Sequence, residues 1–126
     1  VVELTDEAHF NVLSSQLSSD LKHAIIRISQ CANASTIVLQ AAGAHFCVGA
    51  NPHERHERRS LQQLSHRLLD MSLGCCSLRS LELSFFAAAQ GHVVGGGVAL
   101  LLNANFLICT RSSTFEHGNL PRGMHP

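Results

Sequence analysis

Residues 85–110 read FFAAAQGHVVGGGVALLLNANFLICT and hold three consecutive glycines at positions 95–97. The apolar run at residues 83–90 predicts a buried strand, residues 98–103 predict a helix of about two turns, and residues 106–110 predict a further strand. A glycine inside a helix or strand lowers stability by roughly 1 kcal/mol relative to alanine. The glycine triplet at this strand-to-helix junction therefore needs a local reason.

The rest of the chain repeats the alternation of strand and helix. Residues 1–4 and 36–40 are short apolar runs that predict strands. Apolar residues at helical spacing predict one helix through Leu13, Leu17, Leu21, Ala24, Ile25 and Ile28, and a second through Leu61, Leu64, Leu68 and Met71, which follows the polar stretch PHERHERRS. This order indicates an α/β protein with helices packed outside buried sheets.

The composition indicates a single globular domain and disfavours several classes of binding partner. The chain has 126 residues, of which 45% are hydrophobic, with nine acidic and nine basic residues, so it fits one domain with a real core. Its zero net charge favours neither nucleic-acid nor membrane-surface binding, and no apolar run has the length of a membrane span. The odd number of cysteines, five, indicates free thiols in a reducing compartment, and we expect a cytoplasmic protein. The missing initiator Met and the ending GMHP suggest a piece of a longer chain.

A glycine-rich turn between a strand and a helix exposes backbone N–H groups that lack a partner in the helix, and it lets a ligand approach them closely. Such a turn binds a phosphate or stabilises an oxyanion. Phosphate is the weaker interpretation, because the residues match neither GxGxxG nor GxxxxGK[ST]. A third interpretation is that the glycines only allow close packing of the helix on the sheet.

A second glycine loop, AHFCVGAN at residues 44–51, also follows a predicted buried strand. Two loops at the carboxyl ends of strands can meet and direct two N–H groups to one point. The combination of HFCVGAN with QGHVVGGGVAL resembles the crotonase superfamily, the enoyl-CoA hydratase/isomerase group. VLSSQLSSDL, TIVLQAAGAHFCVGAN and TFEHGNLPRGMHP resemble further segments of that family, so the likeness extends over nearly the whole chain.

This resemblance implies a fold and a set of site residues. The fold is α/β, a ββα superhelix of the crotonase/ClpP-like type, with residues 1–126 as the N-terminal and core part of one domain that lacks its C-terminal portion. The implied oxyanion-hole donors are the N–H groups of Val48 and Gly96, and the implied catalytic side chains are His117 and Asn119. Substrate contacts are implied for Phe46, Cys47, Gly49, Ala50, Gly95 and Gly97.

The resemblance also implies the partners. The substrate is a thioester of coenzyme A or of the phosphopantetheine arm of an acyl-carrier protein, with no other cofactor and no metal, and the assembly is a homotrimer. Asn51 stands where the family often has Asp, and we expect it to fix the loop backbone.

The family pattern breaks at two positions. Hydratases of the family use two glutamates, and here these positions are Ala99 and Asn119. Alanine transfers no proton and asparagine is no general base, so hydration by paired glutamates is disfavoured. An oxyanion hole without those bases suits decarboxylation of a β-carboxy or vinylogous acyl thioester, as in the polyketide-associated branch of the family. The candidate proton donors are Glu116, His117, His92 and His125.

Two alternatives stay open: a hydratase or isomerase with other acid–base residues, and a catalytically silent thioester-binding or scaffold domain. Elsewhere, Arg55, Arg58 and Arg59 either contact the phosphates of the carrier or begin a solvated helix. His53 and His56 lie near Cys47 in sequence but lack a zinc-site spacing.

Overall fold

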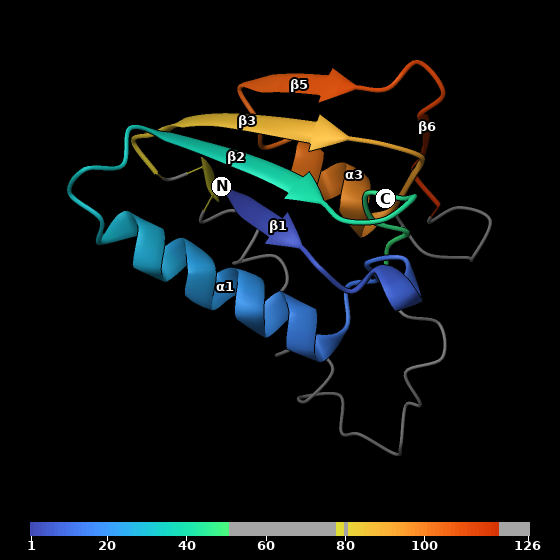
Figure 1. Cartoon of the computed structure of the whole chain (residues 1–126), viewed down its shortest axis with the longest axis horizontal. Helices are drawn as coiled ribbons and strands as arrows, with labels where there is room; N and C mark the ends of the chain where they lie inside the picture. Colours follow the sequence, from blue (N-terminus) through green and yellow to red (C-terminus); the bar gives the residue numbers. More distant parts are fainter. Residues whose placement is uncertain (51–77, 80, 119–126) are drawn as a thin grey trace.

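The chain folds into an α/β structure whose strands are joined through helices and loops. The computed structural model describes residues 1–50, 78–79 and 81–118 (Figure 1). Its elements are β1 (Val2–Leu4), a 3-10 turn η1 (Glu7–His9), α1 (Ser15–Ser29), β2 (Thr36–Ala41), β3 (Ser84–Ala89), β4 (His92–Val94), α3 (Gly96–Leu101), β5 (Phe106–Cys109) and β6 (Thr114–Glu116). The strands predicted at residues 1–4, 36–40, 83–90 and 106–110 are confirmed. The first predicted helix is also confirmed, except that Leu13 lies before its N-cap Ser14 and forms a bridge with Ala50.

The main sheet of the described residues has the strand order β1-β2-β3-β5, and every neighbouring pair is parallel. Figure 1 shows these strands side by side, with their arrowheads toward the same end. Strands β4 and β6 form a separate parallel pair beside this end. Because parallel strands share one carboxyl edge, the loops that leave β2 and β3 begin next to each other.

Helix α1 forms where the apolar spacing predicts it. The Ser14 hydroxyl oxygen accepts a hydrogen bond from the Leu17 N–H at 3.1 Å and caps the first turn. Leu21 and Ile25, one turn apart, are the buried residues of the helix, and they join the hydrophobic core with the sheet. The opposite face carries polar residues, as the amphipathic pattern predicts.

The core continues beneath the first glycine loop. Phe46, Cys47, Val93 and Leu100 have no exposed surface, and they belong to the same cluster as the strand residues Leu39 and Phe85. The segments that contain the glycines are therefore held in place by apolar side chains that pack in the core.

Three further features differ from the sequence prediction. Helix α3 spans Gly96–Leu101 and not residues 98–103, so two of the glycines lie inside it. Strands β4 and β6 have three residues each, which is too short for an alternation pattern to reveal them. Strand β5 is exposed at all four positions within the described part of the chain, where a buried sheet is expected.

The second predicted helix, through Leu61 to Met71, lies outside the described residues. Among the helices that the structure describes, none combines the length and the apolar character needed to cross a membrane.

Candidate functional site

The two glycine loops meet, as the sequence predicts. The Val94 N–H donates to the Cys47 carbonyl oxygen at 3.0 Å, and Cys47 and Val93 form an isolated parallel bridge. The loop after β2 and the segment after β3 thus run side by side for a short distance. This contact holds the start of α3 against residues 44–50.

Glycines allow the two backbones to touch. A Cβ atom on Gly97 would lie 2.5 Å from the Cys47 carbonyl oxygen. A Cβ atom on Gly49, whose φ is +87°, would lie 2.8 Å from the Val94 carbonyl oxygen and 3.8 Å from the Gly96 nitrogen. Close packing, one of the interpretations of the triplet, therefore accounts for Gly97. It does not account for Gly96, whose nitrogen lies beside the other loop.

The amides of the two loops differ in their hydrogen bonding. The Val48 N–H donates to the Phe10 carbonyl oxygen at 3.3 Å, and the Gly95 N–H donates to the Glu116 carbonyl oxygen at 2.8 Å. Within the described residues, the N–H groups of Gly96 and Ala50 have no acceptor. A ligand oxygen would reach the Val48 amide only by replacing a long hydrogen bond, whereas the Gly96 and Ala50 amides need give up no bond to a described residue.

The sequence predicts a substrate contact for Ala50 but not the direction of its amide. Leu13 pairs with Ala50 in an isolated parallel bridge, in which the Leu13 N–H donates to the Gly49 carbonyl oxygen at 2.8 Å. In such a bridge the N–H of Ala50 itself points away from Leu13. No sequence pattern reports the direction of a loop amide, so the direction of the Ala50 N–H became known only from the structure.

The side chains of Phe46 and Cys47 are fully buried. The substrate contacts expected of these two residues could therefore involve only their backbone atoms in this arrangement.

Strand β6 brings one group of proton-donor candidates to the glycine triplet. Glu116 pairs with Val94 in the β4–β6 register and accepts the Gly95 N–H, and His117 follows it directly. Both residues are exposed. Ala99, on the first turn of α3, is exposed and offers only a methyl group.

The candidate His92 lies at the other end of β4. Its Nδ1 is 2.6 Å from the Thr114 hydroxyl, and its ring packs against that of His45 with centroids 4.8 Å apart. The β4–β6 pairing therefore brings Glu116, followed by His117, to the end of β4 that leads into Gly96, whereas His92 lies at the opposite end of β4.

Several predicted positions lie outside the described residues, namely Asn51, His53, Arg55, His56, Arg58, Arg59, Asn119 and His125. In the part of the chain that the structure describes, no group of three or more His, Cys, Asp or Glu side chains could hold a metal ion. Cys31 and Cys109 are free and exposed thiols.

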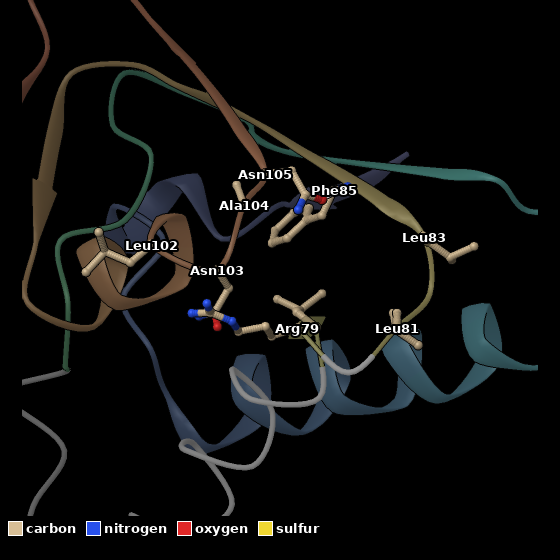
Figure 2. Close-up of a pocket in the computed structure, with 9 residues that line it drawn as sticks. Arg79, Leu81, Leu83, Phe85, Leu102, Asn103, Ala104 and Asn105 are labelled. Atoms are coloured by element: carbon tan, nitrogen blue, oxygen red, sulfur yellow. Dashed lines mark hydrogen bonds between the residues drawn. The ribbon is translucent and has the colours of Figure 1, made fainter.

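A cavity of about 130 Å³ lies elsewhere, at the amino end of β3 and past the last turn of α3 (Figure 2). It is lined by Leu78, Arg79, Leu81, Leu83, Phe85, Leu102, Asn103, Ala104 and Asn105. None of the predicted site residues is among them, so the cavity is distinct from the paired loops.

The fold and the site define a class: an α/β protein in which two glycine loops at the carboxyl edge of a parallel sheet pack backbone against backbone. The sequence profile of the enoyl-CoA hydratase/isomerase family matches residues 1–126. The chain therefore belongs to this family, the crotonases, and the resemblance found in the sequence is confirmed.

Individual relatives span several reactions. The chain is 25% identical over 120 residues to a peroxisomal Delta(3,5)-Delta(2,4)-dienoyl-CoA isomerase of Arabidopsis thaliana, covering 86% of this chain and 43% of that protein. It is 27% identical over 127 residues to the bacillaene synthase decarboxylase PksI of Bacillus subtilis, covering 99% of this chain and 49% of that protein. The chain thus spans about half the length of these relatives.

A solved structure confirms the fold. The crystal structure of an enoyl-CoA hydratase from Mycobacterium smegmatis superposes with a TM-score of 0.89 at 21% identity, over 97% of this chain and 48% of that one.

Proposed function

We propose that this chain forms part of an acyl-thioester lyase that decarboxylates a β-carboxy or vinylogous, glutaconyl-type thioester carried by coenzyme A or an acyl-carrier protein. The proposal depends on the observation that position 99 holds an alanine. It stands exposed one turn into α3, at the position where family hydratases place a glutamate, and it has no group that transfers a proton. The likeness to a decarboxylase of bacillaene synthase supports this choice of reaction.

Decarboxylation needs a site for negative charge more than it needs a base. When the bond to the carboxylate breaks, its electron pair remains on the thioester fragment and is delocalised onto the thioester oxygen as an enolate. Two backbone N–H groups directed at that oxygen stabilise the charge, and each such donor contributes about 3 kcal/mol to lowering the barrier. A single proton delivered to the carbanion then completes the reaction.

Gly96 supplies one donor of this oxyanion hole, and the loop at residues 48–50 supplies the other. Val48 is the donor that the family pattern implies. The hydrogen bonding of the described residues favours the Ala50 amide, because the Val48 N–H already donates to Phe10. Glu116 and His117 are the described candidates for proton delivery, since β6 holds them beside the triplet.

The mass of the product distinguishes the reactions. We expect the purified protein to remove CO2 from a glutaconyl-type thioester and to leave an enoyl thioester unchanged. Addition of water to the enoyl thioester would instead favour a hydratase. Binding of both thioesters without a mass change would favour the scaffold alternative.

The two side chains that the family pattern implies as catalytic are tested by His117→Ala and Asn119→Ala. We expect each change to lower turnover, and His117→Ala by about 100-fold, the usual contribution of a positioned acid or base. Binding of butanoyl-coenzyme A, a thioester that has no carboxylate to lose, should be unaffected, because the oxyanion donors are backbone groups. His23→Ala, an exposed histidine on α1, is the matched control and should retain full turnover. Unchanged turnover in both test variants would remove these residues from the mechanism.

A further inference from the structure

We propose that Asn11 and Gln90 are a pair of positioning residues, an amide clamp that fixes the loop at residues 44–50 and thereby sets the direction of its donor amide. The inference rests on the proposed function, because it assumes that this loop presents an N–H group to a thioester oxygen. Neither side chain is proposed to touch the substrate.

Gln90 holds the segment that leads from β2 into the loop. Its Nε2 donates to the Ala41 carbonyl oxygen at 2.7 Å and to the Gly43 carbonyl oxygen at 3.0 Å. Its own backbone carbonyl accepts the Phe46 N–H, within the loop, at 2.8 Å. A single residue directly after β3 thus forms three bonds to residues 41–46.

Asn11 binds two further carbonyl groups of the same segment. Its Nδ2 donates to the Ala42 and His45 carbonyl oxygens, both at 2.9 Å. Because both partners are acceptors, the orientation of the Asn11 amide is fixed: its nitrogen faces the loop. The two side chains together bind four carbonyls of residues 41–45.

The conformation of Asn11 indicates a specific role. The residue is fully buried, it has a φ of +53°, and its Oδ1 has no hydrogen-bond partner within the described part of the chain. A buried polar atom without a partner costs about 1–3 kcal/mol and needs an explanation. The two bonds from Nδ2 to the loop provide one.

The backbone next to Asn11 extends the clamp to the donor amides. The Phe10 carbonyl accepts the Val48 N–H, and the Leu13 N–H donates to the Gly49 carbonyl oxygen. A shift of Asn11 would therefore be transmitted to residues 48–50. A displacement of about 1 Å at a reacting group can lower the rate about 100-fold, so losing half of the clamp should lower kcat by about 10- to 100-fold with little change in KM.

The test uses Asn11→Ala and Gln90→Ala with matched amide controls. Asn105→Ala removes an Oδ1 that accepts the Phe85 N–H at 2.7 Å, at the opposite end of β3. Gln40→Ala removes a donor to the Glu3 carboxylate at 2.7 Å on the main sheet. The probe is butanoyl-coenzyme A labelled with carbon-13 at the carbonyl, which has no carboxylate to lose.

The readout is the infrared frequency of the bound carbonyl, which falls when N–H groups polarise it. We expect wild-type protein and both controls to lower this frequency and the clamp variants to shift it back toward the free value. If the wild-type protein lowers the frequency, clamp variants that lower it equally would overturn the inference. Because Gln90 is only half-buried, its variant keeps the test available if Asn11→Ala fails to fold.

Hydrogen exchange of the amides at residues 44–50 separates failure of the clamp from failure of the proposed function. Faster exchange in the clamp variants than in the two controls supports the clamp, whatever the infrared result. A wild-type protein that leaves the carbonyl frequency unchanged would contradict the proposed function but not the clamp. Equal exchange in all four variants would overturn the clamp.

Discussion

Replacing Gly97 with alanine should lower the free energy of unfolding by about 2 kcal/mol, the usual scale of overpacking in a filled core. The sign is opposite to helix propensity, which favours alanine over glycine by about 1 kcal/mol inside a helix such as α3. The new Cβ would lie 2.5 Å from the carbonyl oxygen of Cys47 and 3.0 Å from its Cβ. Both atoms belong to a buried residue, so the loops must separate.

Separation of the loops should also lower the proposed thioester turnover. The Gly96 nitrogen and the loop at residues 48–50 would move apart, and an error of about 1 Å in such a site lowers the rate about 100-fold. Urea unfolding and kcat measure the two effects. On the same helix, the reverse substitution Ala99→Gly is the control. It should lower the free energy of unfolding by about 1 kcal/mol through helix propensity alone. A Gly97→Ala protein that is more stable than the wild type would show that the two backbones do not constrain each other.

Periodicity and motif were sufficient to predict the framework of the fold. The spacing of Leu21 and Ile25 predicts the buried face of α1, and the apolar run at residues 36–40 predicts the central strand β2. The pair of glycine loops predicts that two distant segments meet, because both follow strands that end at one edge of a sheet. These signals are local, or they repeat a known pattern.

Other features depend on contacts that the sequence does not encode locally. Asn11 reaches carbonyls 31 and 34 residues away, and Gln90 reaches carbonyls 49 and 47 residues away. Neither residue stands out by type or spacing before the chain is folded. The direction of the Val48 amide is likewise set by Phe10, across the start of the fold, and not by its own loop.

Edge position alone does not explain the exposure of β5, because β1 also lies at an edge of the main sheet and buries Leu4. The residues of β5 are as apolar as those of a central strand, so composition predicts burial, but all four are exposed within the described part of the chain. Burial of a strand is a property of its neighbours, and a single strand's sequence does not report how many it has.

A second large effect is expected at the turn between β3 and β4, where Gly91 has a φ of +61°. An alanine there would adopt a left-handed conformation that costs about 1–2 kcal/mol. Its Cβ would also overlap the Ala44 carbonyl oxygen and lie 2.5 Å from Nδ1 of His45, the atom that accepts the His92 N–H. Strain and overlap together should lower the free energy of unfolding by about 3 kcal/mol.

Gly43→Ala is the comparison, because it combines similar strain with a smaller overlap. Gly43 also has a positive φ, +82°, and the atom nearest a new Cβ there is the Cβ of Glu7 at 2.8 Å, on the exposed turn η1. Its cost in urea unfolding should therefore exceed the strain of about 1–2 kcal/mol but stay below the cost at Gly91. If Gly91→Ala costs no more than Gly43→Ala, residues 44–45 yield as easily as an exposed turn. The loop would then be too loosely held for a backbone amide within it to stabilise a developing charge, because such a donor must be in place before the charge forms.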